Sequence, residues 1–186
     1  MVLLLLGIFL FAGVHLIPSL APSLRANWHA RMGEAGYKGT FSLLLLAAFG
    51  LIIIGWRSIE PVFVYLPPSG LRHPAMLLLV VALLLMVISS RNSRLRRLIR
   101  HPQLTGVTLW GVAHLLLNGD NRSVVLFTSM AAWAVVEMIA INRREGVWIK
   151  AGAPSWGAEL LTVIITLFVV GLVVYVHPWI SGMPVL

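Results

Sequence analysis

The chain has 186 residues, of which 59% are hydrophobic and 11% charged, and this balance excludes an ordinary soluble globular domain. It carries 14 Lys and Arg against 6 Asp and Glu, giving a formal net charge of +8. Cysteine is absent, which excludes disulfides, iron–sulfur clusters and thiolate metal ligands.

Six hydrophobic stretches are long enough, at about 1.5 Å of helical rise per residue, to cross most or all of a hydrocarbon core of about 30 Å. In chain order they are residues 2–18, 40–56, 75–90, 103–118, 123–142 and 158–178. The first lacks the basic segment of a signal peptide, so we expect a retained helix. The longest connection is expected to be a polar loop at residues 19–39. The sequence therefore predicts an all-α polytopic membrane bundle, with residues 1–186 as a single integral membrane domain.

The basic residues divide unevenly between the connections of this bundle. The connections after the first, third and fifth helices hold Arg25, Arg31, Lys38, Arg91, Arg94, Arg96, Arg97, Arg100, Arg143, Arg144 and Lys150. The other connections hold only Arg57, Arg72 and Arg122. Because positive charge concentrates on the cytoplasmic side of a membrane, we expect both termini outside and the basic run at residues 91–101 beside cytoplasmic headgroups. That run indicates topology and a contact with membrane lipids, and we expect no nucleic-acid partner.

Only two of the six histidines, His15 and His114, lie well inside expected helices. A polar ring in hydrocarbon is costly without a partner, so each is a candidate for a functional site and also for a hydrogen bond to a neighbouring helix. His101 cannot share a metal with His114, because the helix between them spans roughly 20 Å. The partner of His114 must therefore come from another helix.

The surroundings of the two histidines are alike. Small residues and one aromatic residue share the helix face with each histidine: Gly106, Trp110 and Gly111 for His114, and Gly7, Phe11 and Ala12 for His15. Such a face could hold a macrocycle, with neutral imidazole as an axial ligand of a b-type haem between bundle helices. It could equally let two membrane helices approach closely.

Depth in the membrane leaves the partner of His114 open. Counted along the helices, His15 lies roughly 9 Å and His114 roughly 18 Å from the cytoplasmic boundary. The difference of about 9 Å requires tilted helices, so His73 and His177 on the outer side stay open as rival partners.

Carboxylates are rare inside the expected helices. Glu137 alone lies deep, where it could pair with an arginine, orient a ligand histidine or relay a proton. Asp120 and Glu159 lie near helix starts, where they are expected to act as caps or interface residues.

The segment RHPQLTGVTLWGVAHLLLNGD, residues 100–120, resembles the hallmark segment of the NnrU family, membrane proteins named for an association with nitrite and nitric oxide reduction. The resemblance extends over nearly the whole chain, including GVHLIPSLAPSLR at residues 13–25 and YKGTFSLLLLAAFGLIIIGW at residues 37–56. The RHP that opens a helix also resembles isoprenylcysteine-type methyltransferases, but more weakly. This chain has no segment that closely resembles their cofactor-binding segment.

The NnrU family is similar to 15-cis-zeta-carotene isomerase, an integral membrane enzyme that holds a b-type haem. This resemblance implies that His15 and His114 are haem ligands. It also implies a pocket role for His177, because VYVHPWISG resembles the C-terminal segment of the isomerase. The isomerase has a cysteine where this chain has Gly111, a departure that argues against the isomerase mechanism and leaves the haem site in place.

The sequence thus predicts a multi-pass protein of the bacterial cytoplasmic membrane that binds haem b. The expected metal ligands are His15 and His114, and the other expected pocket residues are Gly106, Trp110, Gly111, Glu137 and His177. The expected function is a redox or nitric-oxide-related module linked to nitrite and nitric oxide metabolism. The alternatives are a haem-dependent cis–trans isomerase of a carotenoid-like polyene and a haem-free assembly factor for a respiratory complex. Expected partners are lipids, nitric oxide or a polyene, and respiratory or denitrification proteins.

Overall fold

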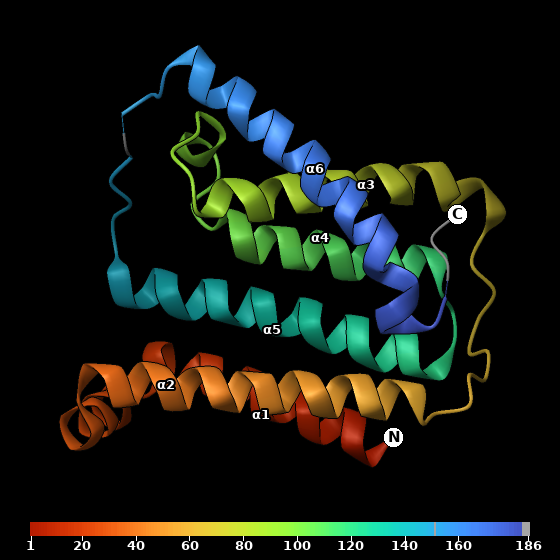
Figure 1. Cartoon of the computed structure of the whole chain (residues 1–186), viewed down its shortest axis with the longest axis horizontal. Coiled ribbons are helices and arrows are strands. Elements are labelled where there is room, and N and C mark those ends of the chain that lie inside the picture. The colour runs from red at the N-terminus through yellow and green to blue at the C-terminus, as the bar shows by residue number, and fades with distance from the viewer. Residues whose placement is uncertain (151, 184–186) are drawn as a thin grey trace. The chain divides into compact units, whose positions relative to one another are not determined.

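The computed structural model describes residues 1–150 and 152–183, and this part of the chain is helical apart from its connections. The helices are α1 (Val2–Leu20), α2 (Pro22–Arg57), α3 (Arg72–Ser89), α4 (Pro102–Leu117), α5 (Asn121–Glu145) and α6 (Trp156–Ser181) (Figure 1). Short 3₁₀ turns, Ser69–Leu71 and Leu95–Arg97, precede α3 and α4. The predicted all-α fold is confirmed, and every helix except the 16-residue α4 is long and apolar enough to cross a membrane.

Two compact units make up the fold, Met1–Pro61 and Val62–Leu186. The first contains α1 and α2, and the second contains α3 to α6. The expectations of a single domain and of two external termini stay predictions.

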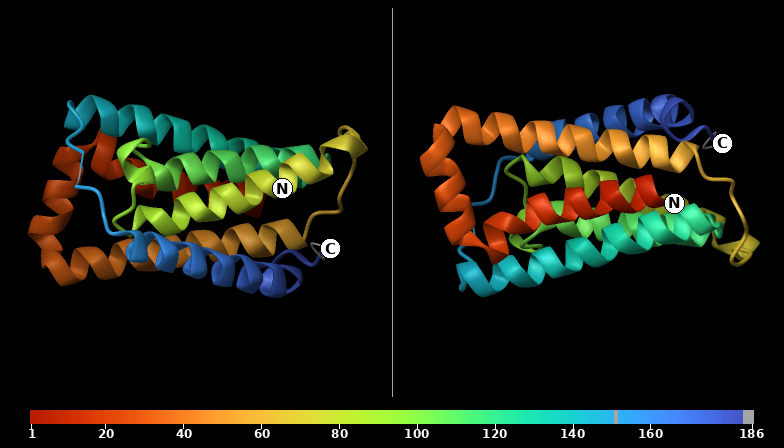
Figure 2. Two further views of the ribbon diagram at one scale, coloured as in Figure 1. Left: turned by 90° about the horizontal axis from the view of Figure 1, so that it is seen from above. Right: turned by 90° about the horizontal axis from the view of Figure 1, so that it is seen from below.

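In the first unit, α1 and the part of α2 after Gly33 form a hairpin, and the chain turns between them at Ala21 and at Gly33 (Figure 2). Their backbones approach closely because glycine stands at the contacts. A Cβ atom added at Gly7 would lie 2.8 Å from the backbone nitrogen of Ile52, and one at Gly55 would lie 2.4 Å from that of Leu4. Close packing of small residues is a usual way for membrane helices to associate, and here it fixes the hairpin.

The prediction of a polar loop at residues 19–39 is wrong, because α2 already begins at Pro22. Proline suits the first helical turn, where its missing amide has no helical partner to lose. The helix bends at Gly33, whose φ of 68° is easily reached by glycine alone. The rings of Trp28 and Tyr37, on either side of this bend, have centroids 5.0 Å apart. Polarity in this stretch therefore marks exposed helix faces, not the absence of a helix.

In the second unit, α4 packs against α3 on one side and α5 on the other, and α6 packs against α3 (Figures 1 and 2). The two halves of α6 differ in packing. Thr162 and Thr166 in its first half are buried, and none of its described residues after Thr166 is buried.

An extended segment at residues 62–66 closes the end of the second unit where α4 meets α5. The amides of Val64 and Tyr65 donate to the Gly119 carbonyl at 2.7 and 3.1 Å. The Tyr65 hydroxyl donates to the carbonyls of Leu115 and Asn118 at the end of α4. Partial burial and the nearby carboxylate of Asp120 raise the pKa of Tyr65. Hydrogen bonds from this one segment thus satisfy carbonyls that the end of a helix leaves without partners.

The predicted role of Asp120 as a helix cap is confirmed at the start of α5. Its carboxylate accepts from the Ser123 amide at 3.0 Å and from the Ser123 hydroxyl at 2.6 Å, at the start of α5. These bonds fix the sharp turn between α4 and α5.

Candidate functional site

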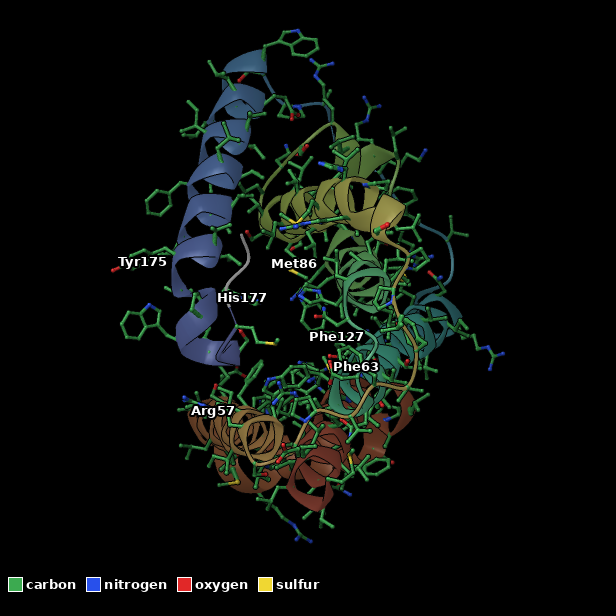
Figure 3. All side chains as sticks on the ribbon, turned by 90° about the vertical axis from the view of Figure 1, so that its right-hand side faces the viewer. Arg57, Phe63, Met86, Phe127, Tyr175 and His177 are labelled. Carbon is green, nitrogen blue, oxygen red and sulfur yellow. The ribbon has the colours of Figure 1, made fainter. Side chains whose placement is uncertain are left out.

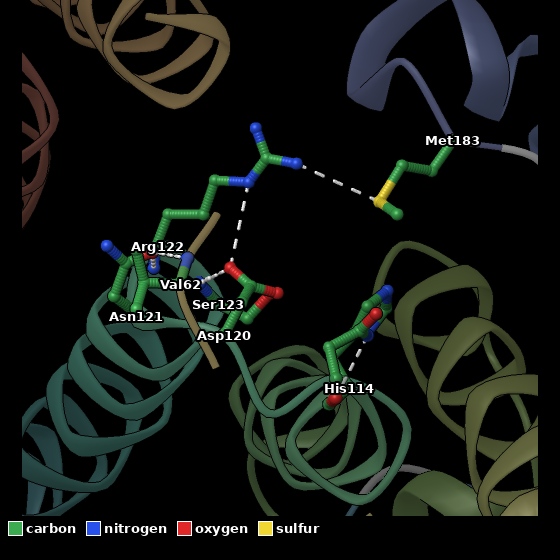
Figure 4. Close-up of polar contacts among 8 residues, drawn as sticks. Val62, His114, Asp120, Asn121, Arg122, Ser123 and Met183 are labelled. Atoms are coloured by element: carbon green, nitrogen blue, oxygen red, sulfur yellow. Dashed lines mark hydrogen bonds and ion pairs between the residues drawn. The ribbon is translucent and has the colours of Figure 1, made fainter. Parts of the chain in front are cut away.

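His114 lies in the last turn of α4 with its ring held from two sides. Its Nδ1 lies 2.9 Å from the backbone oxygen of Trp110, one turn earlier. Figure 4 shows His114 in a close-up with Asp120 and Ser123, at the turn that leads into α5. The Phe127 ring of α5 stacks on it, with centroids 4.3 Å apart. A carbonyl oxygen can only accept a hydrogen bond, so Nδ1 of His114 carries the proton. In the neutral ring, the basic nitrogen is therefore Nε2.

The structure brings His177 of α6 beside His114. The two ring centroids are 6.5 Å apart, and the ring planes lie within 23° of parallel. Figure 3 shows His177 on the inner side of α6, whereas Tyr175 points away from the unit. Nδ1 of His177 is 2.9 Å from the backbone oxygen of Met183, so this ring also donates through Nδ1. Of the rival partners left open by the sequence, His177 is the one that the second unit places next to His114.

His15, in the first unit, repeats the local arrangement of His114. Its Nδ1 lies 2.9 Å from the backbone oxygen of Phe11, one turn earlier in α1. The Phe11 ring also lies against it, with centroids 4.2 Å apart. The pairing of His15 with His114 across one metal stays a prediction, because it concerns both units.

The remaining histidines differ from these three. Nε2 of His29 bonds to the Glu34 carboxylate. Nε2 of His101 bonds to the side-chain oxygen of Asn142 at 2.8 Å. His73 is exposed in the first turn of α3. His15, His114 and His177 thus bond through Nδ1 to backbone oxygens, whereas His29 and His101 bond through Nε2 to side-chain oxygens.

Comparison with known families settles the relationship of the chain. The sequence model of the family described as "NnrU protein" matches residues 3–185. The chain belongs to the NnrU family. No curated protein and no solved structure matches it. The NnrU match spans both units and includes His15, His114 and His177.

The glycines beside His114 have a packing role in this NnrU protein. A Cβ atom added at Gly106 would lie 2.8 Å from the Ala82 carbonyl oxygen of α3. One added at Gly111 would lie 2.8 Å from the Phe127 carbonyl oxygen of α5. Neighbouring helices therefore fill the space that these glycines leave, which favours close helix packing over a flat surface for a macrocycle. A side chain at position 111 would therefore force α4 and α5 apart.

Two other expected pocket residues, Trp110 and Glu137, differ in how close they lie to the pair His114 and His177. Trp110 contacts His114 directly, with ring centroids 4.9 Å apart, and meets the Phe127 ring edge-on. Glu137 is buried farther along α5, and its expected roles stay predictions.

Sequence reasoning missed Phe127 and Met183 as neighbours of the histidine pair. Phe127 belongs to another helix, and no local pattern connects it with His114. The sequence does contain a signal for the position of Met183, namely the glycine before it. Gly182 directly follows α6 and adopts a left-handed conformation, with φ of 77°. Glycine after a helix commonly turns the chain back, here bringing the Met183 carbonyl to His177.

Proposed function

We propose that this multi-pass membrane protein of the NnrU family binds one b-type haem, which Nε2 of His114 would help to hold. The supporting observation is the bond from Nδ1 of His114 to the Trp110 carbonyl. Metal-ligating histidines usually donate their other ring N–H to such an acceptor, which fixes the tautomer and the ring orientation. Phe127 stacks on the same ring and restricts its rotation.

Two histidines of the second unit would be available to hold the iron of a haem. The rings of His114 and His177 have centroids 6.5 Å apart, and both donate through Nδ1, which leaves the basic Nε2 of each for a metal. No group of three or more His, Cys, Asp or Glu side chains suited to a metal occurs among the described residues, whereas a haem can be held by two histidines.

His15 is the competing second ligand. It donates through Nδ1 to a carbonyl one turn earlier, as His114 does, and the likeness to the isomerase implies it. We therefore propose that His114 would hold the haem together with a second histidine, either His177 or His15.

A bound haem would supply one-electron transfer when two histidines hold the iron, or gas binding when one dissociates. The chain's own contribution is to hold imidazole in the basic Nε2 tautomer and to shield it with Trp110 and Phe127. Together with the association from which the family is named, this favours a redox or nitric-oxide-related role at the membrane.

The test is the haem content of the purified protein and of single variants. We expect a Soret band in the wild type, its loss in His114→Ala, and its retention in the matched controls His29→Ala and His101→Ala, whose rings bond through Nε2. Loss in either His177→Ala or His15→Ala identifies the second ligand. A wild-type protein without a Soret band after haem supplementation would overturn the proposal, as would equal haem content in all variants.

A further inference from the structure

The connections at one end of the second unit form a single basic surface, made of residues 91–100 and 143–150, which we call the basic end. Figure 1 shows these connections, between α3 and α4 and after α5, at the same end of the unit. The Arg100 guanidinium joins them by donating to the Gly146 carbonyl at 2.6 Å. His101 adds a bond to Asn142 at 2.8 Å. The two segments, which lie about forty residues apart in the chain, therefore present their charges together.

Positive charge at the basic end exceeds what the protein neutralises. The cations are Arg91, Arg94, Arg96, Arg97, Arg100, Arg143, Arg144 and Lys150. The carboxylates at or beside this surface are Glu145 and Glu159, and both already have partners. Among the described residues, no ion pair involves Arg96, Arg97, Arg143 or Lys150. The surplus calls for an anionic partner from outside the chain.

A network of hydrogen bonds holds the arginine-bearing turn in place. Ser93 is fully buried, and its hydroxyl donates to Glu159 of α6 at 3.1 Å. The Arg94 amide donates to the same carboxylate at 2.6 Å. The Arg91 side chain donates to Thr162 at 3.0 Å. These hydrogen bonds hold the backbone of the turn at Leu95–Arg97 in place. Binding of a ligand by its arginines therefore requires little further ordering of the chain and loses little conformational entropy.

Apolar side chains interrupt the cations and point away from the protein. Leu98 is 75% exposed, and Val147 and Ile149 are each 90% exposed. The Lys150 ammonium lies 5.1 Å from the ring centroid of Trp148. This mixture suits the boundary of a bilayer, where apolar side chains enter the acyl region and cations reach phosphate groups. A nucleic acid or an acidic protein surface would satisfy the arginines and leave these apolar side chains in water.

We propose that the basic end is a binding surface for the headgroups of anionic phospholipids, with Arg96, Arg97 and Arg143 as the main phosphate-contacting residues. Basic residues near an anionic membrane surface are attracted to its phosphate groups, and the attraction grows with their number. The surface is independent of the haem proposal, because it lies at the start of α4 and His114 lies at its end.

The experiment measures thermal unfolding of the purified full chain in detergent, with phosphatidylglycerol or phosphatidylcholine added at equal concentration. Phosphatidylglycerol is expected to raise the midpoint of the wild type more than phosphatidylcholine does. The variant R96Q/R97Q is expected to lose at least half of this difference. The matched control R57Q/R72Q removes two arginines outside the basic end and is expected to keep it.

Several outcomes overturn the proposal: no preference for phosphatidylglycerol in the wild type, an equal preference in both double variants, or the same midpoint shift with inorganic phosphate alone. Phosphate alone would identify a simple anion site in place of a headgroup surface. If R96Q/R97Q fails to fold, the exposed pair R143Q/K150Q replaces it, with the same required loss.

Discussion

Replacing Gly106 by alanine tests whether the small residues of α4 serve helix packing. The new methyl carbon would lie 2.8 Å from the Ala82 carbonyl oxygen, where ordinary contact begins at 3.4 Å. Helices α3 and α4 must therefore separate by about 0.6 Å, and overpacking of this kind costs about 1–3 kcal/mol. The better helix propensity of alanine returns up to about 1 kcal/mol. We expect a net loss of about 1–2 kcal/mol in the free energy of unfolding.

The assay is thermal unfolding of the haem-free protein in detergent, followed by tryptophan fluorescence. A net loss of this size lowers the midpoint by roughly 2–8 °C in a chain of this length. Gly50→Ala is the matched control, because a Cβ atom at Gly50 meets nothing within 4 Å. Its midpoint should stay unchanged or rise.

The packing argument fails if Gly106→Ala leaves the midpoint of the haem-free protein unchanged. A reduced haem content in such a variant would instead assign Gly106 to a cofactor surface, as one interpretation of the sequence proposed.

Three further substitutions test the segment that contains Tyr65, the arginine-bearing turn before α4 and the bend in α2. Tyr65→Phe removes the hydroxyl bonds to the end of α4 and should cost about 1 kcal/mol. The pKa of Tyr65 is raised in the folded protein, so the stabilisation by its hydroxyl is fully present below a pH of about 10 and is lost at higher pH. The unfolding midpoints of the wild type and Tyr65→Phe should therefore converge in alkaline buffer. A difference that stays constant with pH would contradict this. Glu159→Gln weakens the charge-assisted bonds to Ser93 and Arg94 and should speed proteolysis at residues 91–100; unchanged cleavage would show that the bonds do not hold the turn. Gly33→Ala places a side chain at φ of 68° and should lower the midpoint, whereas Gly39→Ala, at an ordinary φ with open space, should not; equal effects would exclude backbone strain.

Hydrophobicity predicted the membrane helices well because it also drives their burial in lipid. The stretch expected at 158–178 is α6 at Trp156–Ser181, and that expected at 75–90 is α3 at Arg72–Ser89. The same criterion failed at residues 19–39, where the helix is mostly polar and exposed. A helix outside the hydrocarbon needs no apolar run, so hydropathy gives no signal for it.

The candidate site was only partly readable from the sequence. The chain itself singled out His114, because an imidazole in an apolar helix is costly without a partner. Its neighbour His177 could not be chosen in advance, because that contact depends on how α6 packs against α3. The use of Nδ1 as the donor could not be predicted either, because it depends on the rotation of each ring toward a carbonyl.

The central claim is that Nε2 of His114 binds haem iron, and rescue by imidazole tests it most directly. The variant His114→Gly removes the ring and leaves space for a free imidazole molecule between Trp110 and Phe127. The absorption spectrum of the haem-supplemented variant is recorded with and without imidazole. The account predicts a weak Soret band that imidazole restores to the wild-type position and intensity, with no effect of imidazole on His101→Gly. A wild-type spectrum in His114→Gly without imidazole would contradict the claim.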